Sequence, residues 1–117
     1  MSNSKAILLS LFLIFLSACS ESTIEFENLV ERGDVYYEKF STEPFSGRVT
    51  GLRVGKLVNG RFEGEVFEFR SNGQLRNETS YSRGLRHGIQ RFFTDEGKLA
   101  RVNELKNGEL LGFKYFY

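Results

Sequence analysis

Hydrophobic and polar residues alternate along the second half of the chain, and this alternation predicts β-strands. Between Glu65 and Arg70, the side chains of Phe67 and Phe69 fall on one side of an extended chain and Glu68 falls on the other. Apolar residues of the same parity continue at Leu75, Tyr81, Ile89, Phe93, Leu99, Leu105, Phe113, Tyr115 and Tyr117, with Arg91, Phe92 and Phe116 as exceptions. We therefore expect a row of short strands with one aromatic face and one mostly polar face.

One pattern of glycines and apolar residues recurs every 24 residues. Three segments have a glycine at each end, namely Gly60–Gly64, Gly84–Gly88 and Gly108–Gly112, and Gly73 and Gly97 form a further column. Phe69, Phe93 and Tyr117 form an aromatic column with the same spacing. A fixed period of this length predicts a repeat architecture, in which each unit is one supersecondary element that stacks on its neighbours.

The glycines also predict the turns between the strands. Asn59-Gly60, Arg83-Gly84 and Asn107-Gly108 separate the units, and Ser71-Asn72-Gly73 and Asp95-Glu96-Gly97 lie within them. Glycine and asparagine tolerate the positive φ angles of tight hairpin turns. We expect structural turn roles for Gly60, Gly64, Gly73, Gly84, Gly88, Gly97, Gly108 and Gly112. The predicted fold is all-β, an antiparallel meander of β-hairpin repeats that forms one elongated sheet.

Residues 1–18 have the pattern of a signal peptide rather than of the folded domain. Met1 to Lys5 carry a positive charge, and Ala6 to Leu16 are almost wholly apolar but too short for a bilayer, which needs about 20 residues. The following Leu16-Ser17-Ala18-Cys19 resembles the lipobox of bacterial lipoproteins. The resemblance implies that Cys19 is acylated and attaches the chain to a membrane, although an ordinary secretory signal ending near a cysteine is an alternative.

The lipobox resemblance also implies a location. Ser20 follows the cysteine, and similarity to the sorting rules of Gram-negative lipoproteins favours the outer membrane of the cell envelope. We expect a tether over residues 19–27 and the hairpin-repeat domain over residues 28–117. Cys19 is the only cysteine of the chain, so it forms no internal disulfide.

The segment before the repeats predicts a short hairpin around Arg32-Gly33-Asp34. Val35-Tyr36-Tyr37 has the β-branched and aromatic residues that strands favour. A helix is the alternative, because Ser22 and Glu25 are spaced like a capping box.

Charge is distributed unevenly along the chain. From Cys19 to Gly47 there are seven acidic and two basic residues, whereas Arg48 to Tyr117 contains thirteen basic and eight acidic residues. The two parts can pair with each other, or the basic part can meet an acidic partner or a membrane surface. Scattered solvated charges are the alternative.

No group of residues predicts catalysis or a cofactor. His87 is the only histidine and is expected in an exposed turn, so neither a zinc cluster nor a histidine-based triad can form. Glu65 and Glu68 point to opposite sides of a strand, which does not suit paired carboxylates. The glycines lack the lysine and helix of a phosphate-binding loop. We expect a protein that is not an enzyme and that binds no metal, cofactor or nucleic acid.

The order of glycine and aromatic residues resembles the MORN repeat variant. The pattern is Gly84, Gly88, Phe93, Gly97 and Leu99. The run from Pro44 to Gly51 is similar to the first segment of YwqK-family antitoxins of toxin–antitoxin systems. This family often has tryptophan two residues after the second glycine, where this chain has Val66, Gln90 and Lys114.

The resemblance implies a repeat sheet that binds a protein. The expected function is a lipid-anchored, non-enzymatic protein-binding or scaffolding module. The alternative is an antitoxin or immunity protein that neutralises a partner toxin by direct binding.

An aromatic row is the candidate contact surface for the protein partner. Its residues are Phe67, Phe69, Phe93, Tyr115 and Tyr117, which have the same parity in successive hairpins. Aromatic side chains offer large contact areas at low entropic cost. Alternatively, these rings form the core by packing against Phe26, Tyr36, Tyr37 and Phe40.

Overall fold

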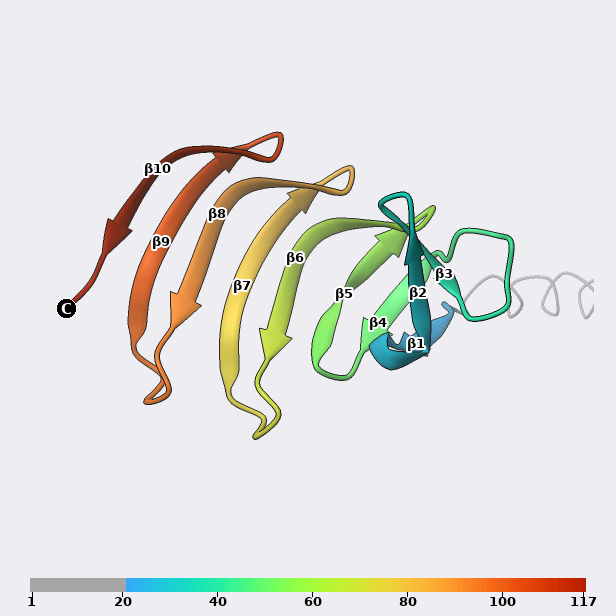
Figure 1. Cartoon of the computed structure of the whole chain (residues 1–117), viewed down its shortest axis with the longest axis horizontal. Coiled ribbons are helices and arrows are strands. Elements are labelled where there is room, and N and C mark those ends of the chain that lie inside the picture. The colour runs from blue at the N-terminus through green and yellow to red at the C-terminus, as the bar shows by residue number, and fades with distance from the viewer. Residues whose placement is uncertain (1–20) are drawn as a thin grey trace, which may run out of the picture.

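A computed structural model describes residues 21–117 as an all-β structure dominated by one long sheet (Figure 1). The signal peptide and Cys19 lie outside the described residues. The long sheet contains eight strands in the order β1-β4-β5-β6-β7-β8-β9-β10. Their bounds are β1 Thr23–Glu25, β4 Gly47–Thr50, β5 Arg53–Val58, β6 Arg61–Phe69, β7 Leu75–Ser82, β8 Leu85–Phe93, β9 Leu99–Lys106 and β10 Glu109–Tyr115. From β4 onward each strand pairs antiparallel with the next, which confirms the predicted meander.

The first strand departs from the predicted organisation. β1 pairs parallel with β4, with Ile24 beside Val49, so the prediction of a tether over residues 19–27 is wrong from Thr23 onward. Ile24 is buried, and this burial holds the segment on the sheet. The capping-box helix is also wrong, because only a single 3₁₀ turn, η1 (Phe26–Asn28), forms there.

A two-stranded hairpin covers the first part of the long sheet, so the prediction of a single sheet is wrong. Its strands are β2 (Leu29–Arg32) and β3 (Val35–Glu38), and they pair around Gly33 and Asp34 as the sequence predicted. The hairpin crosses in front of β4 and β5 in Figure 1. It is needed because the apolar residues of the first strands would otherwise face water.

The core lies between this hairpin and the first strands of the sheet. Its buried residues are Ile24, Leu29, Val49, Leu57, Phe62 and Val66, and the half-buried Phe26, Tyr36, Phe45 and Tyr81 pack against them. We call this side of the long sheet the inner face and the opposite side the outer face. Directly paired residues share a face, so the inner face continues in one row through Val66, Thr79, Gln90, Asn103 and Phe113.

Three backbone hydrogen bonds fasten the hairpin to the turn between β5 and β6. The Tyr36 amide donates to the Gly60 carbonyl (2.8 Å), the Gly60 amide donates to the Phe45 carbonyl (2.7 Å), and the Phe45 amide donates to the Tyr36 carbonyl (3.0 Å). We call this ring of bonds the Gly60 clamp. Gly60 has a φ of 77° and is buried, so no side chain fits at this position without displacing the hairpin.

The predicted glycine turns are right at some positions and wrong at others. Gly60, Gly84 and Gly108 occupy two-residue hairpin turns, and Gly73 and Gly97 occupy the turns at the opposite edge of the sheet. Gly64, Gly88 and Gly112 instead lie inside β6, β8 and β10. Gly64 and Gly88 have positive φ where extra residues interrupt the pairing with the preceding strand. They are sites of irregular pairing inside strands rather than chain reversals.

The last strand is paired differently from its predecessors. Val54 pairs with Phe67, and 24 residues later Glu78 pairs with Arg91. Val102 then pairs with Lys114, one residue earlier than Tyr115, which this spacing would give. The cause is a smaller irregularity in β10, where one extra residue lies between Leu110 and Gly112. This one-residue shift moves every later side chain of β10 to the opposite face.

The Gly60 clamp predicts an unequal cost of alanine at two glycines with positive φ. Gly73→Ala meets no atom within 4 Å of its added Cβ and should destabilise the protein by roughly 1–2 kcal/mol through its backbone conformation. In Gly60→Ala the Cβ would meet Val35 and lie 2.8 Å from the Tyr36 carbonyl oxygen. We expect about 1–3 kcal/mol of additional destabilisation, as for an overpacked site.

Urea unfolding of both variants measures this difference. Equal free energies of unfolding for Gly60→Ala and Gly73→Ala would contradict the described contact between the hairpin and the turn.

Candidate functional site

A cleft of about 560 Å³ opens where the hairpin meets the inner face of the long sheet. One wall is the hairpin, which contributes Glu31, Asp34 and Tyr36. The other wall is formed by Arg53, Arg61, Phe62, Tyr81, Arg83 and Leu85 of the long sheet. Two walls from separate sheets are a common origin of binding sites, because neither sheet alone encloses a ligand.

Aromatic rings form the floor of the cleft. The ring centroids of Phe26 and Tyr36 are 6.0 Å apart, those of Tyr36 and Phe62 are 5.3 Å apart, and those of Phe62 and Tyr81 are 5.6 Å apart. All three pairs are tilted or edge-on, an arrangement that adds to the energy of burying the rings. The floor is therefore a rigid apolar surface that spans hairpin and sheet.

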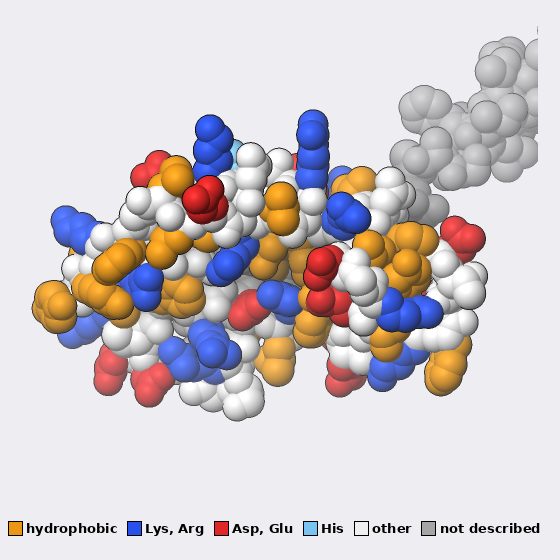
Figure 2. Space-filling model, turned by 45° about the horizontal axis from the view of Figure 1, so that its top comes forward, with side chains coloured by type: hydrophobic (Ala, Val, Ile, Leu, Met, Phe, Trp, Pro, Cys, Tyr) orange, Lys and Arg blue, Asp and Glu red, His pale blue; other side chains and the backbone are white. Residues whose placement is uncertain are grey.

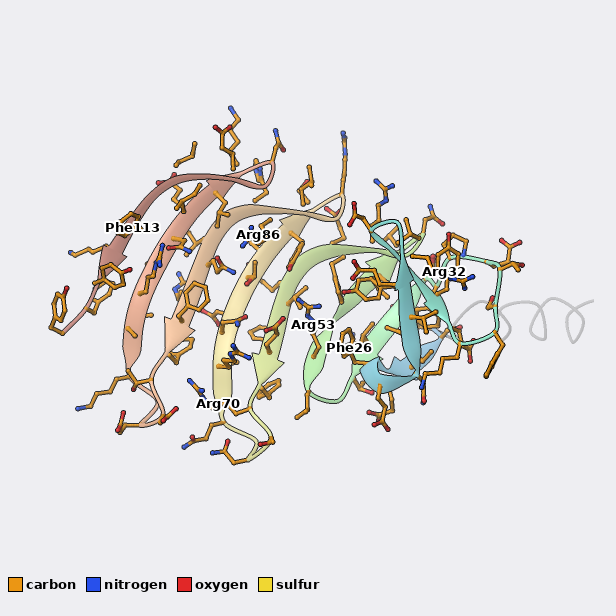
Figure 3. The ribbon with its side chains drawn as sticks, viewed as in Figure 1. Phe26, Arg32, Arg53, Arg70, Arg86 and Phe113 are labelled. Atoms are coloured by element: carbon orange, nitrogen blue, oxygen red, sulfur yellow. The ribbon has the colours of Figure 1, made fainter. Side chains whose placement is uncertain are left out.

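Arg53 connects the aromatic floor to the rest of the inner face. Its guanidinium donates to the Tyr36 hydroxyl (3.1 Å) and forms an ion pair with Glu68 (2.5 Å). It also lies 5.4 Å from the Phe26 ring centroid and 5.3 Å from that of Phe62, and Figure 3 shows Arg53 beside Phe26 under the hairpin. Its buried Nε has no hydrogen-bond partner. Arg53 thus has one free donor in a site where its charge is already balanced.

Tyr36 is held as a neutral phenol. Burial, followed by a hydrogen bond to Glu31, raises the pKa of Tyr36 from its ordinary value of 10.0 to about 12. Both effects disfavour the phenolate, while the charge of Arg53 acts in the opposite direction. The hydroxyl is therefore available for hydrogen bonding at the rim of the cleft at neutral pH.

The charges of the two walls have opposite sign. Glu31 and Asp34 project from the hairpin, and Arg61 and Arg83 project from the turns of the sheet. Within residues 21–117 no ion pair joins these two walls. The uneven charge distribution of the sequence is therefore brought together at this cleft without being neutralised by direct contact.

Beyond the hairpin, polar side chains satisfy one another along the inner face. Buried Gln90 donates to the Thr79 hydroxyl (3.0 Å) and accepts a bond from Asn103 (3.1 Å). Arg101 donates to Asn103 (2.6 Å) and to the Tyr115 hydroxyl (3.2 Å). This polar ladder lets a single layer bury side chains that have no second layer above them.

The structure separates the residues of the predicted aromatic row, so their common face is wrong. Phe67 is paired with Glu78 on the outer face, whereas Tyr115 is paired with Arg101 on the inner face. The register shift in β10 is the reason. Phe69 and Phe93 are half-buried, and Tyr117 is fully exposed at the chain end. Their role in binding a partner stays a prediction, but they do not form one surface.

The alternative prediction, a core made of this row and the hairpin aromatics, is also wrong in detail. Phe26 and Tyr36 do pack in the core, but their partners are Phe62 and Tyr81. Phe40 is fully exposed. Sequence parity missed Phe62 because irregular pairing at Gly64 separates it from the later strands.

His87 is not in a turn. It lies in β8, is half-buried, and its Nδ1 accepts a hydrogen bond from the Asn107 amide (3.2 Å). Glu63 accepts the Arg83 amide in the corresponding position of the preceding turn (2.6 Å). Both side chains therefore support hairpin turns. No cluster of three or more histidine, cysteine, aspartate or glutamate side chains suited to a metal ion occurs among residues 21–117.

Comparison of the chain with protein-family models, with curated proteins and with solved structures finds no match. The part of the chain that the structure describes also contains no helix long and apolar enough to cross a membrane.

The raised pKa of Tyr36 predicts a loss of stability at high pH. The folded protein favours the neutral phenol, so this contribution is present below pH 10 and is lost as the pH rises toward 12. We expect the free energy of unfolding to fall over this range more steeply in the wild type than in Tyr36→Phe. Urea unfolding at several pH values, with the ultraviolet absorbance of phenolate as a second readout, measures both effects. Identical pH dependence of the two proteins would refute the assigned environment of Tyr36.

Proposed function

We propose that this protein is a lipid-anchored, non-enzymatic protein-binding module of the cell envelope, built from MORN-type β-hairpin repeats. The observation that carries the proposal is the cleft between the hairpin and the inner face, with its aromatic floor and its two walls of opposite charge. A soluble domain keeps such a recess open only where its lining is rigid, and here the Gly60 clamp and the chain of rings provide this rigidity.

The chemistry of the cleft favours a segment of a protein as its occupant. Phe62 and Tyr81 offer ring surface to an apolar side chain, while Arg53 Nε and the Tyr36 hydroxyl offer polar contacts. The unpaired walls suit a segment that carries both an acidic and a basic group, since each charge then meets its opposite. Buried aromatic and arginine residues are also those that contribute most to protein–protein binding.

The pairing pattern supports the repeat architecture. Arg53 pairs with Glu68 and Asn77 pairs with Phe92, again 24 residues apart in both members. Each hairpin contacts mainly its neighbours along the sheet, which is the organisation expected of repeat proteins. Such a sheet separates a binding end from the rest of the chain without a second domain.

The proposed lipid anchor would place the cleft near a membrane. Thr23, the first residue of β1, is four positions after Cys19. Four residues of chain span at most roughly 15 Å. An acylated Cys19 would therefore hold the hairpin end of the sheet close to the lipid surface, where a partner in the same membrane would meet it.

Photo-crosslinking tests the proposed binding site. A benzophenone amino acid replaces Leu85, an exposed residue of the cleft, and in a matched variant it replaces Glu104, an exposed residue of the outer face. In native membranes we expect a discrete adduct from position 85 and at least about tenfold less from position 104, because a cleft-bound segment contacts only the former. Immunoblotting measures both yields.

Two further variants make this experiment decisive. Arg53→Met should reduce the adduct at position 85, and Cys19→Ala should leave an unprocessed precursor that lacks both lipid label and adduct. Equal adducts at positions 85 and 104 would contradict the proposal. A toxin as the crosslinked partner would assign the protein to the antitoxin or immunity class instead of the scaffolding class.

A further inference from the structure

The last strand, β10, forms an open edge of the long sheet that is unusually apolar. It ends the strand order, so no described strand lies beyond it. Its exposed apolar residues are Leu110, Leu111, Phe113 and Tyr115, which are 45–58% exposed. Figure 2 shows hydrophobic side chains gathered at this end of the molecule. A long apolar edge of this kind tends to pair with another strand.

The backbone of β10 is ready for such pairing. In an antiparallel pair, the amide and carbonyl groups of successive residues point alternately toward the neighbouring strand and away from it. The Phe116 amide donates to the Ala100 carbonyl (2.9 Å) in the direction of β9. Phe113, three positions earlier, and Tyr115, one position earlier, therefore direct their backbone groups to the open edge.

The register shift of β10 sorts its side chains into two sets. Leu110 is paired with Leu105 and Phe113 with Asn103, which places both on the inner face. Glu109 is paired with Lys106 and Lys114 with Val102, which places both on the outer face. Without the extra residue at Leu111, Leu110 and Phe113 would lie on opposite faces.

This sorting makes the strand complementary to itself. When two β10 strands lie antiparallel with Leu110 opposite the partner's Phe113, Glu109 falls opposite the partner's Lys114. Twofold symmetry repeats each pair, which gives two apolar pairs on the inner face and two pairs of opposite charge on the outer face. A twofold axis perpendicular to the sheet keeps each face continuous, as this pairing requires.

We propose that two copies of this chain join through β10 to form one continuous sheet across a symmetric dimer. The open edge at β1 is a poorer partner for β10, because β1 contains only three residues whereas β10 contains seven. Pairing of β10 with β1 would also leave two open edges and propagate into a fibre, whereas the symmetric pair is closed. The dimer goes beyond the proposed function and uses the end of the sheet away from the cleft.

Exchange of the two charges tests the dimer. The full chain, purified from membranes in detergent and studied by native mass spectrometry, is expected to be a dimer. Lys114→Glu alone or Glu109→Lys alone places like charges opposite each other twice, and should raise the dissociation constant about tenfold or more. Lys98→Glu, in an exposed turn away from β10, has the same change of charge as Lys114→Glu and should leave the dimer intact.

Mixing distinguishes a broken interface from a misfolded variant. In an equimolar mixture of the Lys114→Glu and Glu109→Lys variants, both cross-strand pairs are again of opposite charge, so a heterodimer should form. The double variant, which carries both changes in one chain, should dimerise like the wild type. A monomeric wild type, single variants as dimeric as the wild type, or a mixture that stays monomeric would each overturn the proposal.

Discussion

The Gly60 clamp is the interaction on which the rest of the molecule depends. Three backbone hydrogen bonds join Tyr36, Phe45 and Gly60, and they hold a separate hairpin against the long sheet. Each bond contributes only about 0.5–1.5 kcal/mol on its own. Their combined effect is larger, because they bring Tyr36 onto Phe62 and so close the core that contains Leu29, Leu57 and Val66. The cleft exists only while the hairpin is in this position.

A single-layer sheet has to satisfy the exposed parts of its faces in other ways. Where the hairpin lies, apolar side chains are buried between two layers. Beyond it, buried Thr79, Gln90 and Asn103 bond to one another across three strands, so their polar groups need no cover. At β10 neither solution applies, and apolar side chains remain exposed. The three regions correspond to a core, a self-satisfied surface and an edge suited to association.

The sequence predicted local features better than the arrangement of segments that are distant along the chain. Glycine and asparagine dictate tight turns locally, so the Asn59-Gly60 turn and the hairpin at Gly33 were predictable. Parity along the chain fails wherever an extra residue enters a strand, which is why Tyr115 was placed on the wrong face. The parallel pairing of β1 with β4 and the position of the hairpin depend on burial of Ile24 and Leu29 by residues far along the chain. The cleft was not predictable for the same reason, although the opposite charges of the two segments were an indication.

Native-state hydrogen exchange of the Tyr36 amide tests most directly whether the hairpin is an integral layer of the structure. This amide has its acceptor at Gly60 in the long sheet and not within the hairpin. If the clamp holds the two sheets as one cooperative unit, the Tyr36 amide should require the same opening free energy as the central amides of β5 and β6. Exchange of the Tyr36 amide as fast as that of the exposed chain end at Tyr117 would show that the hairpin detaches, and would contradict this account of the core and the cleft.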